Sequence, residues 1–299
     1  MDKLLSFLLI EGLLTNIGGL LTLISSVPNI IVGNAAGISF ITFFIKAAPY
    51  VAVATCITIF MGAKLFGIKK LGSEEERTEA KTLVGSFDEN DGIHSKGFFI
   101  FSTIMLFAFI GVIATTSILP TVSDLGMGFV ALAFAVVMLS SYKSEVDQFY
   151  KAIDWDLIIF FMSLFVVIAV MEHAQVLNLI GQGITFIIGT NESLFGTGML
   201  LVVSAAFSSV TDNIPLAAML AKILQANGTA ADSSLWWSVI FGANLGGNLT
   251  PIGSASTLVA VTIMHKYKLP LSFLGFIKKA LPFAALHIAL AVGYVLAFA

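Results

Sequence analysis

The chain has 299 residues, of which 58% are hydrophobic and only 11% are charged, and its formal net charge is −3. With a mean hydropathy of +0.98, this composition excludes an ordinary soluble domain and predicts an all-α polytopic membrane protein. The single cysteine, Cys56, excludes an intramolecular disulfide and any cysteine-based metal cluster, and we expect it to be a small buried hydrophobe.

Long apolar runs and the interruptions between them predict the elements in chain order. A full span needs about 20 residues. The charged segment after the third apolar run opens with a capping-box pattern at Ser73, which predicts the start of a short helix. We predict a broken span at 4–33, an interfacial stretch at 38–47, a full span at 48–66 and a cytoplasmic loop at 67–97. There follow full spans at 98–119, 124–142 and 157–172, a mixed stretch at 173–192, a broken segment at 193–224, a second broken span at 234–264, an interfacial stretch at 270–280 and a last span at 281–299.

One motif occurs twice, each time inside a long apolar stretch. NIGGLLTLI begins at Asn16 and NLGGNLTPI begins at Asn244, so the two copies are offset by 228 residues. A second pair of similar segments follows in the same order, SFITFFIKAAP from Ser39 and SFLGFIKKALP from Ser272. A single duplication at this distance predicts two structural halves.

The distribution of basic residues predicts the orientation of these halves, because lysine and arginine favour the cytoplasmic side in short loops. If Lys3 is cytoplasmic and 193–224 is a re-entrant hairpin, only Lys46 and Lys222 of the 15 basic residues fall outside. A full span at 193–224 would move four further lysines outside. The hairpin is therefore favoured, and it makes the duplication an inverted repeat, which is typical of secondary transporters.

Paired glycines inside hydrocarbon are costly, because each lowers helix stability by roughly 1 kcal/mol relative to alanine and a broken backbone needs polar partners. Two interpretations remain open, a ligand site made by exposed helix ends and close packing of helices through small residues. The polar residues around both pairs favour the ligand site. The candidates are Asn16, Gly18, Gly19, Thr22, Pro28, Asn29, Asn244, Gly246, Gly247, Asn248, Thr250 and Gly253. Ser25, Ser26 and Asn34 belong with Pro28 and Asn29 to a polar exit from the first broken helix, which we expect to line the same cavity.

A carboxylate interrupts the apolar segment 193–224. Asp212 is flanked by Thr211 and Asn213, and an intramembrane carboxylate costs on the order of 3 kcal/mol on insertion scales. Asp212 is thus expected to carry a proton or to bind Na⁺ together with Asn213 and Asn244. The alternative is that Asp212 caps the second helix of the hairpin, and the two roles are compatible. Ser208 and Ser209 precede it as possible hydroxyl ligands.

Two other titratable residues lie in apolar surroundings. Glu11 is either a second proton site or an interfacial residue, and the interface is favoured, whereas His287 is expected to be packed and hydrogen-bonded. The sequence contains no nucleophile elbow, phosphate loop or pair of catalytic acids, so we expect no enzyme and no cofactor beyond a coupling H⁺ or Na⁺.

The segments SSVTDNIP from Ser208, GANLGGNLTPIGSAS from Gly242 and NIGGLLTLISSVPNIIVGNAAGISF from Asn16 resemble the ion transporter superfamily. The similarity is greatest to its arsenical pump and P-protein branch, which includes arsenite permeases, D-type sodium/proton antiporters and, more distantly, citrate transporter-like and dicarboxylate permeases. It implies a multi-pass protein of the lipid bilayer, in the inner membrane if prokaryotic, with two inverted repeats and a homodimeric assembly. By this resemblance Asp212 and Asn213 lie at the tip of the second hairpin.

Relatives in that superfamily carry a first hairpin and several spans before the first broken helix, and this sequence does not show them. A truncated gene model, a split transporter completed by a separate polypeptide that supplies the hairpin, and an inactive remnant all fit, and the first two are favoured. The domains are then 1–66 as the last part of the first repeat, 67–97 as the loop and 98–299 as the second repeat.

The expected function is secondary active transport of a small inorganic ion or oxyanion, of the arsenite/antimonite efflux or sodium/proton antiport type, coupled to protons or sodium. A sodium-coupled citrate or dicarboxylate carrier is the first alternative. A non-autonomous subunit and an ion channel are the others.

Overall fold

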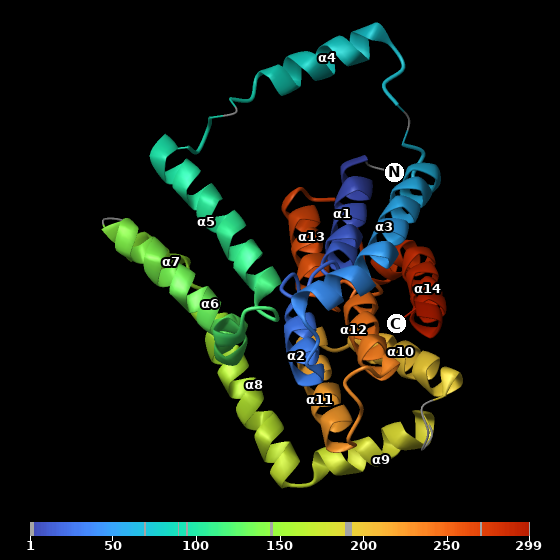
Figure 1. Ribbon diagram of the computed structural model, residues 1–299. Coiled ribbons are helices and arrows are strands. Elements are labelled where there is room, and N and C mark those ends of the chain that lie inside the picture. Colours follow the sequence, from blue (N-terminus) through green and yellow to red (C-terminus); the bar gives the residue numbers. More distant parts are fainter. Residues whose placement is uncertain are drawn as a thin grey trace. The chain divides into compact units, whose positions relative to one another are not determined.

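The computed structural model describes residues 3–68, 70–88, 90–93, 95–143, 146–188, 193–269 and 271–298, and in these ranges all regular structure is α-helical (Figure 1). The chain divides into two compact units, Gly67–Asp154 and the remainder, Met1–Phe66 with Trp155–Ala299. Both copies of the repeated motif belong to the larger unit.

Five helices of the described residues are long and apolar enough to cross a membrane. They are α3 (Phe40–Leu65), α5 (Lys96–Thr115), the Asp124–Ser141 part of α6 (Pro120–Ser141), α8 (Trp155–His173) and α14 (Phe273–Phe298). The predicted all-α, polytopic membrane class is thereby confirmed.

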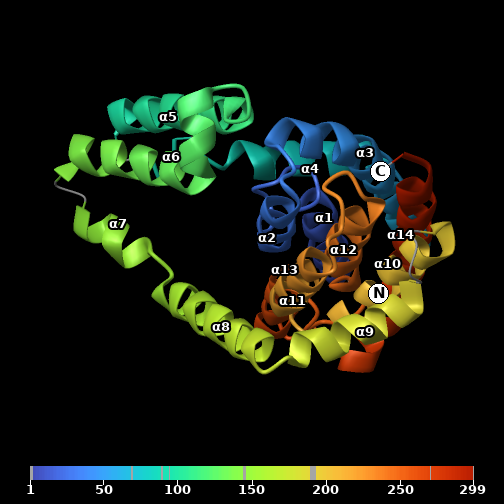
Figure 2. The ribbon, with the colours of Figure 1, turned by 60° about the horizontal axis from the view of Figure 1, so that its bottom comes forward.

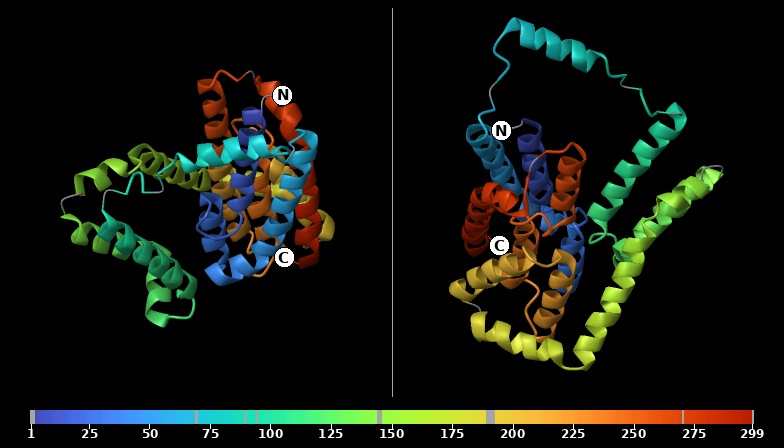
Figure 3. Two further views of the ribbon diagram at one scale, coloured as in Figure 1. Left: turned by 90° about the horizontal axis from the view of Figure 1, so that it is seen from above. Right: turned by 180° about the vertical axis from the view of Figure 1, so that it is seen from behind.

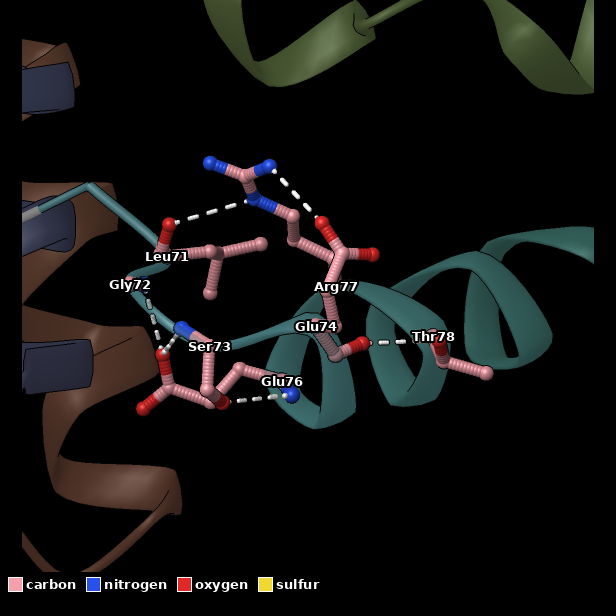
Figure 4. A network of polar contacts seen from close by, with 7 residues as sticks. All are labelled: Leu71, Gly72, Ser73, Glu74, Glu76, Arg77 and Thr78. Atoms are coloured by element: carbon pink, nitrogen blue, oxygen red, sulfur yellow. Dashed lines mark hydrogen bonds and ion pairs between the residues drawn. The ribbon is translucent and has the colours of Figure 1, made fainter.

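The smaller unit contains α4 (Glu74–Gly85), α5, α6 and α7 (Val146–Ala152). A capping box starts α4 as predicted, with the Ser73 hydroxyl accepting from the Glu76 amide at 3.0 Å (Figure 4). In return the Glu76 carboxylate accepts from the amides of Ser73 at 3.3 Å and Gly72 at 2.8 Å. These bonds satisfy amides that have no partner within the helix.

The larger unit contains two helix–break–helix elements with matching bounds. In the first, α1 (Lys3–Gly18) and α2 (Val27–Ala36) flank residues 19–26, and in the second, α12 (Ser234–Gly246) and α13 (Ala255–Lys266) flank residues 247–254. Both breaks begin directly after the first glycine of the repeated pair, at the same offset of 228 residues. The duplication seen in the sequence is therefore also a duplication of elements.

One long helix follows each broken element, and here the sequence prediction was wrong. We expected an interfacial stretch and a separate span in each half, but α3 and α14 are each a single helix of 26 residues. Pro49 and Pro282 lie inside these helices at equivalent places. A proline removes only one hydrogen bond from such a helix, and in a membrane helix the freed backbone groups find other partners, so the helix continues.

The segment 193–224 forms two helices, α10 (Leu194–Ser208) and α11 (Asn213–Ala226), preceded by α9 (Val176–Ile188). Helix α10 lies along α12 (Figures 1 and 2). The two helices run in the same direction, because the contacting residues of α10 and α12 are the same number of residues apart in the sequence at each contact. The Ser238 hydroxyl donates to the Thr197 carbonyl, Gly242 faces Leu201, and Gly246 faces Ala205. Small residues four apart on α12 thus allow close approach of the two backbones.

The broken elements lie side by side and run in opposite directions (Figures 1 and 3). Helix α1 contacts α13, with Gly12 against Ala260 and the preceding turn of α13, whereas α2 contacts α11 and α12. An apolar core packs α1, α13 and α14 against one another. Its fully or nearly fully buried members include Leu9, Leu13, Met264, Phe276 and Phe283.

A buried polar contact joins α3 to α14, as expected for a hydrogen-bonded His287. Its Nε2 lies 2.7 Å from the Thr58 hydroxyl, and the Tyr50 hydroxyl donates to the His287 carbonyl at 2.9 Å. The Thr58 hydroxyl donates to the Ala54 carbonyl at 2.6 Å, so Nε2 of the neutral ring carries the hydrogen and donates to Thr58.

We expect Thr58→Val to lower the free energy of unfolding by about 1–3 kcal/mol, because it leaves the buried imidazole N–H without an acceptor. Thermal unfolding of the purified protein in detergent measures the effect. Thr262→Val is the matched control, since that exposed hydroxyl bonds only to the Leu258 carbonyl of its own helix. Equal melting temperatures for the two variants would contradict a stabilising contact between α3 and α14.

Candidate functional site

Asn16, at the end of α1, is bonded to the second break and to the start of α13. Its side-chain nitrogen donates to Asn248 Oδ1 and to the Ser254 hydroxyl, both at 2.8 Å. Its side-chain oxygen accepts from the Ser256 hydroxyl at 2.6 Å. Asn248 is fully buried and its own amide points to the Leu13 carbonyl at 3.4 Å. The first copy of the motif is thus hydrogen-bonded to the second half of the chain.

Asn244, at the end of α12, makes the corresponding bonds to the first half. Its side-chain oxygen accepts from the Ser26 hydroxyl at 2.7 Å, and its nitrogen donates to Asn29 Oδ1 at 2.9 Å and to the Ile240 carbonyl at 2.7 Å. Ser26 and Ser254 occupy equivalent positions in the two copies. Each motif asparagine therefore binds the serine that precedes the second helix of the opposite broken element.

Side chains also satisfy the carbonyl groups that the first break frees. The Asn29 amide donates to the carbonyls of Gly19 at 2.7 Å and Thr22 at 2.9 Å, and Asn29 is fully buried. The hydroxyl of Ser25 accepts from the Thr22 amide at 3.0 Å. Buried Pro28 occupies the first turn of α2, where a missing N–H costs nothing. The break is thus internally hydrogen-bonded, as a non-helical segment at membrane depth requires.

The repeated glycines differ in their surroundings. A Cβ atom added at Gly246 would collide with the Ala205 backbone, and at Gly247 it would lie 2.9 Å from Ser254 Cβ and 3.0 Å from the Gly253 carbonyl. A Cβ atom added at Gly18 would meet nothing within 4 Å, and at Gly19 it would lie 3.3 Å from the carbonyl oxygens of Thr15 and Asn16 and 3.7 Å from Ser26 Cβ. Close packing was the alternative explanation for the glycines that the sequence left open. It explains Gly246, which packs on α10, and the pair Gly247 and Gly253, which contact each other.

Thr211, Asp212 and Asn213 lie where α10 gives way to α11, and the hydrogen bonds of Thr211 and Asp212 stay within this segment. Asp212 is exposed and its carboxylate accepts from the Ile214 amide at 3.0 Å, so it caps α11. The exposed Thr211 hydroxyl donates to the Phe207 carbonyl at 2.8 Å, and Asn213 is the first residue of α11.

The bonds from this region to α12 and its break come from the neighbouring serines. Ser208 donates to the Ala243 carbonyl, and Thr250 donates to the Ser209 carbonyl. The hydrogen bonds of Asp212 and Asn244 in the described structure therefore go to different partners.

Two residues of this network were missed in the sequence, Ser254 and Ser256. The signal for Ser254 was available, because it stands at the position equivalent to Ser26. One other expectation was wrong: Cys56 is exposed on the surface of α3 instead of buried.

The site is polar but uncharged. Its hydrogen-bonding side chains are asparagines, serines and threonines, and α2 and α13 both start next to the Asn16 and Asn244 bonds. Helix N-termini carry partial positive charge and unpaired amides, which favour an anion. Within the described ranges, no group of three or more histidine, cysteine, aspartate or glutamate residues is placed to hold a metal ion.

Comparison with known proteins places this arrangement in a family. A family model described as citrate transporter matches residues 1–242. A 46 kDa membrane protein of Mycobacterium leprae is 30% identical over 291 residues, which cover 95% of this chain and 66% of that protein. An uncharacterized transporter of Synechocystis is 27% identical over 308 residues, covering 96% and 67% of the two chains. The mouse P protein is 25% identical over 182 residues, which cover 58% of this chain and 22% of that protein.

The chain thus spans about two thirds of the length of these bacterial relatives, since it covers 66% of the first and 67% of the second. The family model extends from the first residue into α12 and includes α10, α11 and the first break. The chain is an integral, multi-pass membrane protein that belongs to the citrate transporter family.

Proposed function

We propose that this chain forms the substrate-binding part of a secondary active transporter for a small anion, coupled to H⁺ or Na⁺. The observation that carries the proposal is the reciprocal bonding of the two breaks, Asn16 to Ser254 and Asn244 to Ser26. It brings the N-termini of two helices to one place inside the apolar unit. In transporters with broken helices, such N-termini hold the anionic groups of the substrate.

We further propose that the two halves form an inverted repeat, with 1–66 and 98–299 as its parts and 67–97 as a cytoplasmic loop. The opposite directions of the broken elements and the equivalent serines at their contacts support this. On this view α10 and α11 form a re-entrant hairpin, and rocking of one half against the other would expose the site alternately to each side.

Citrate or a similar small carboxylate is the first substrate to test, because the family model carries that description. The uncharged donors and the two helix N-termini suit carboxylate groups. Arsenite or antimonite efflux and sodium/proton antiport form the second candidate, which Asp212 favours, because a carboxylate at the hairpin tip suits cation handling. A homodimer in the cell membrane is the assembly we propose for either substrate.

Asp212 is the proposed coupling residue. It is exposed and accepts one backbone hydrogen bond, so its other oxygen is available to a proton or to Na⁺. A sodium site that includes Asn213 and Asn244 would use the Asn244 side-chain oxygen, which accepts from Ser26 at 2.7 Å. Proton coupling requires the Asp212 carboxylate alone.

The test is Asp212→Asn, which keeps the helix cap because asparagine caps as well as aspartate. We expect unchanged folding and a fall of at least about 100-fold in citrate or arsenite flux driven by a pH or sodium gradient, because the coupling charge is lost. Flux is measured with radiolabelled solutes in membrane vesicles from cells of the source organism. Asp232→Asn, in the exposed loop before α12, is the control. Unchanged flux and pH dependence in Asp212→Asn would exclude Asp212 as the coupling residue.

A further inference from the structure

A cavity of about 730 Å³ lies within the smaller unit, at the end of α5 where that apolar helix begins. Its walls come from the turn before α5, the first turns of α5, the end of α6 and α7. Aromatic rings form much of the lining, because Phe98 packs edge-to-face on Tyr142 with ring centroids 4.6 Å apart and stacks on Phe149 at 6.1 Å. A cavity of this size with aromatic walls is typical of a site for a small organic molecule.

An apolar groove of about 270 Å³ between α5 and α6 adjoins this cavity. Ser102 and Leu106 line both spaces, and the other groove residues are methionines, phenylalanines and alanines. Phe109 of α5 packs edge-to-face on Phe134 of α6 along it, with centroids 5.5 Å apart. Both helices are long and apolar enough to cross a membrane, so the groove faces hydrocarbon. The cavity and the groove together suit an elongated molecule with an apolar tail.

Ser102 stands where the cavity meets the groove, and its buried hydroxyl oxygen has no hydrogen-bond partner among the residues that the structure describes. Other hydroxyls of α5 donate to the carbonyl four residues earlier, as Thr103 does to Phe99 at 2.8 Å and Thr115 does to Gly111 at 2.9 Å. A buried hydroxyl without a partner is costly. A ligand that places a hydrogen-bond acceptor at Ser102 would remove this cost.

The rim of the cavity carries charges of both signs, although its described lining residues are all uncharged. The direct sequence neighbours of lining residues include two lysines and two aspartates, all four of them exposed: Lys96, Lys143, Asp91 and Asp147. A headgroup that carries both a phosphate and an amine matches such a rim. A purely anionic headgroup would meet the two carboxylates as well as the two lysines, so its attraction would be weaker.

We infer that the cavity and the groove together bind one phospholipid with a zwitterionic headgroup that carries a primary amine. The headgroup lies at the rim, with its phosphate toward the lysines and its amine toward the aspartates. One acyl chain lies in the groove between α5 and α6. In a glycerophospholipid the ester carbonyl stands between headgroup and chain, so it accepts from the Ser102 hydroxyl where the two spaces meet. This site is separate from the two breaks and does not depend on the proposed transport function.

Photocrosslinking with a labelled lipid tests this inference without any transport measurement. The purified chain is reconstituted in lipid discs of phosphatidylglycerol that contain a trace of phosphatidylethanolamine with a diazirine on one acyl chain. We expect adducts within 98–109 of α5 and 131–142 of α6, and unlabelled phosphatidylethanolamine should compete for them. The same diazirine on phosphatidylglycerol should give at least about 10-fold less adduct at these residues, because its headgroup has no amine for the aspartates.

Two pairs of variants locate the site. Ala135→Phe fills the groove and should reduce the adduct at least about 10-fold, whereas Ala133→Phe, at an exposed position of α6 outside the groove, should leave it unchanged. Ser102→Ala should reduce the adduct about 5-fold to 10-fold, because it removes the hydrogen bond to the ester. Thr103→Val is its control, since that hydroxyl is already bonded to the Phe99 carbonyl.

Adducts spread evenly over α5, α6 and α8, or a full yield in both Ala135→Phe and Ser102→Ala, would overturn the site. The absence of adducts on α5 and α6 would show that protein covers the groove, and would overturn it too. Equal yields from the two labelled lipids would overturn the assignment of the headgroup. Melting temperatures of all variants are measured in parallel, and Ser102→Ala, which only removes a hydroxyl, keeps the test decisive if Ala135→Phe does not fold.

Discussion

Replacing Gly246 with alanine should destabilise the protein strongly, although the change adds only one methyl group. The added Cβ would lie against the Ala205 carbonyl group and 2.8 Å from Ala205 Cα, and backbone atoms cannot turn away as a side chain does. Helix α10 would therefore have to separate from α12. We expect a cost of about 3 kcal/mol, the upper end for overpacking, and a melting temperature lower by about 6 °C or more.

The chain offers a matched control at the equivalent position of the other copy. Gly18→Ala meets nothing within 4 Å, so its melting temperature should stay the same or rise, because alanine is the better helix former. Thermal unfolding in detergent, followed by tryptophan fluorescence, compares the two variants. An equal fall in melting temperature for Gly18→Ala and Gly246→Ala would mean that both glycines are needed for the conformation of the breaks. The packing of α10 on α12 would then not be the reason for glycine at position 246.

Replacing Asn244 with alanine should abolish transport. The change removes the bonds to Ser26 and Asn29 together, and it leaves buried Asn29 without the donor to its side-chain oxygen. Each unsatisfied buried group costs about 1–3 kcal/mol. The first break would lose its side-chain bonds to the end of α12, and a displacement of about 1 Å at such a site lowers activity about 100-fold.

Uptake of citrate and of arsenite is measured in membrane vesicles, with the amount of folded protein determined in parallel. Asn178→Ala is the control, because that side chain makes only an exposed 3.3 Å bond to Gln175. Asn244→Asp separates the two contacts, since it still accepts from Ser26 but cannot donate to Asn29. Normal uptake by Asn244→Ala, after correction for the amount of folded protein, would contradict a role of Asn244 in transport.

Much of the fold could be predicted from the sequence because hydropathy and backbone breakers act locally. The composition specified an all-α membrane protein, and the glycine pairs specified where α1 and α12 end. The capping box at Ser73 was predictable because its partners lie within three residues of each other. The prediction was wrong at the internal prolines of α3 and α14. A helix-breaking residue in the sequence does not show whether the helix around it continues.

The pairing of residues in the site was decided by tertiary structure alone. Asn16 and Ser254 are 238 residues apart, and Ser26 and Asn244 are 218 apart, so no local periodicity relates them. The same applies to the glycines, because Gly18 and Gly246 stand in equivalent sequences and only the position of α10 distinguishes them. The sequence by itself determined that the chain breaks twice within an apolar unit. Long-range packing decided that each break is bonded to the helix end of the other broken element, and that α12 has a covered face where the matching face of α1 is open.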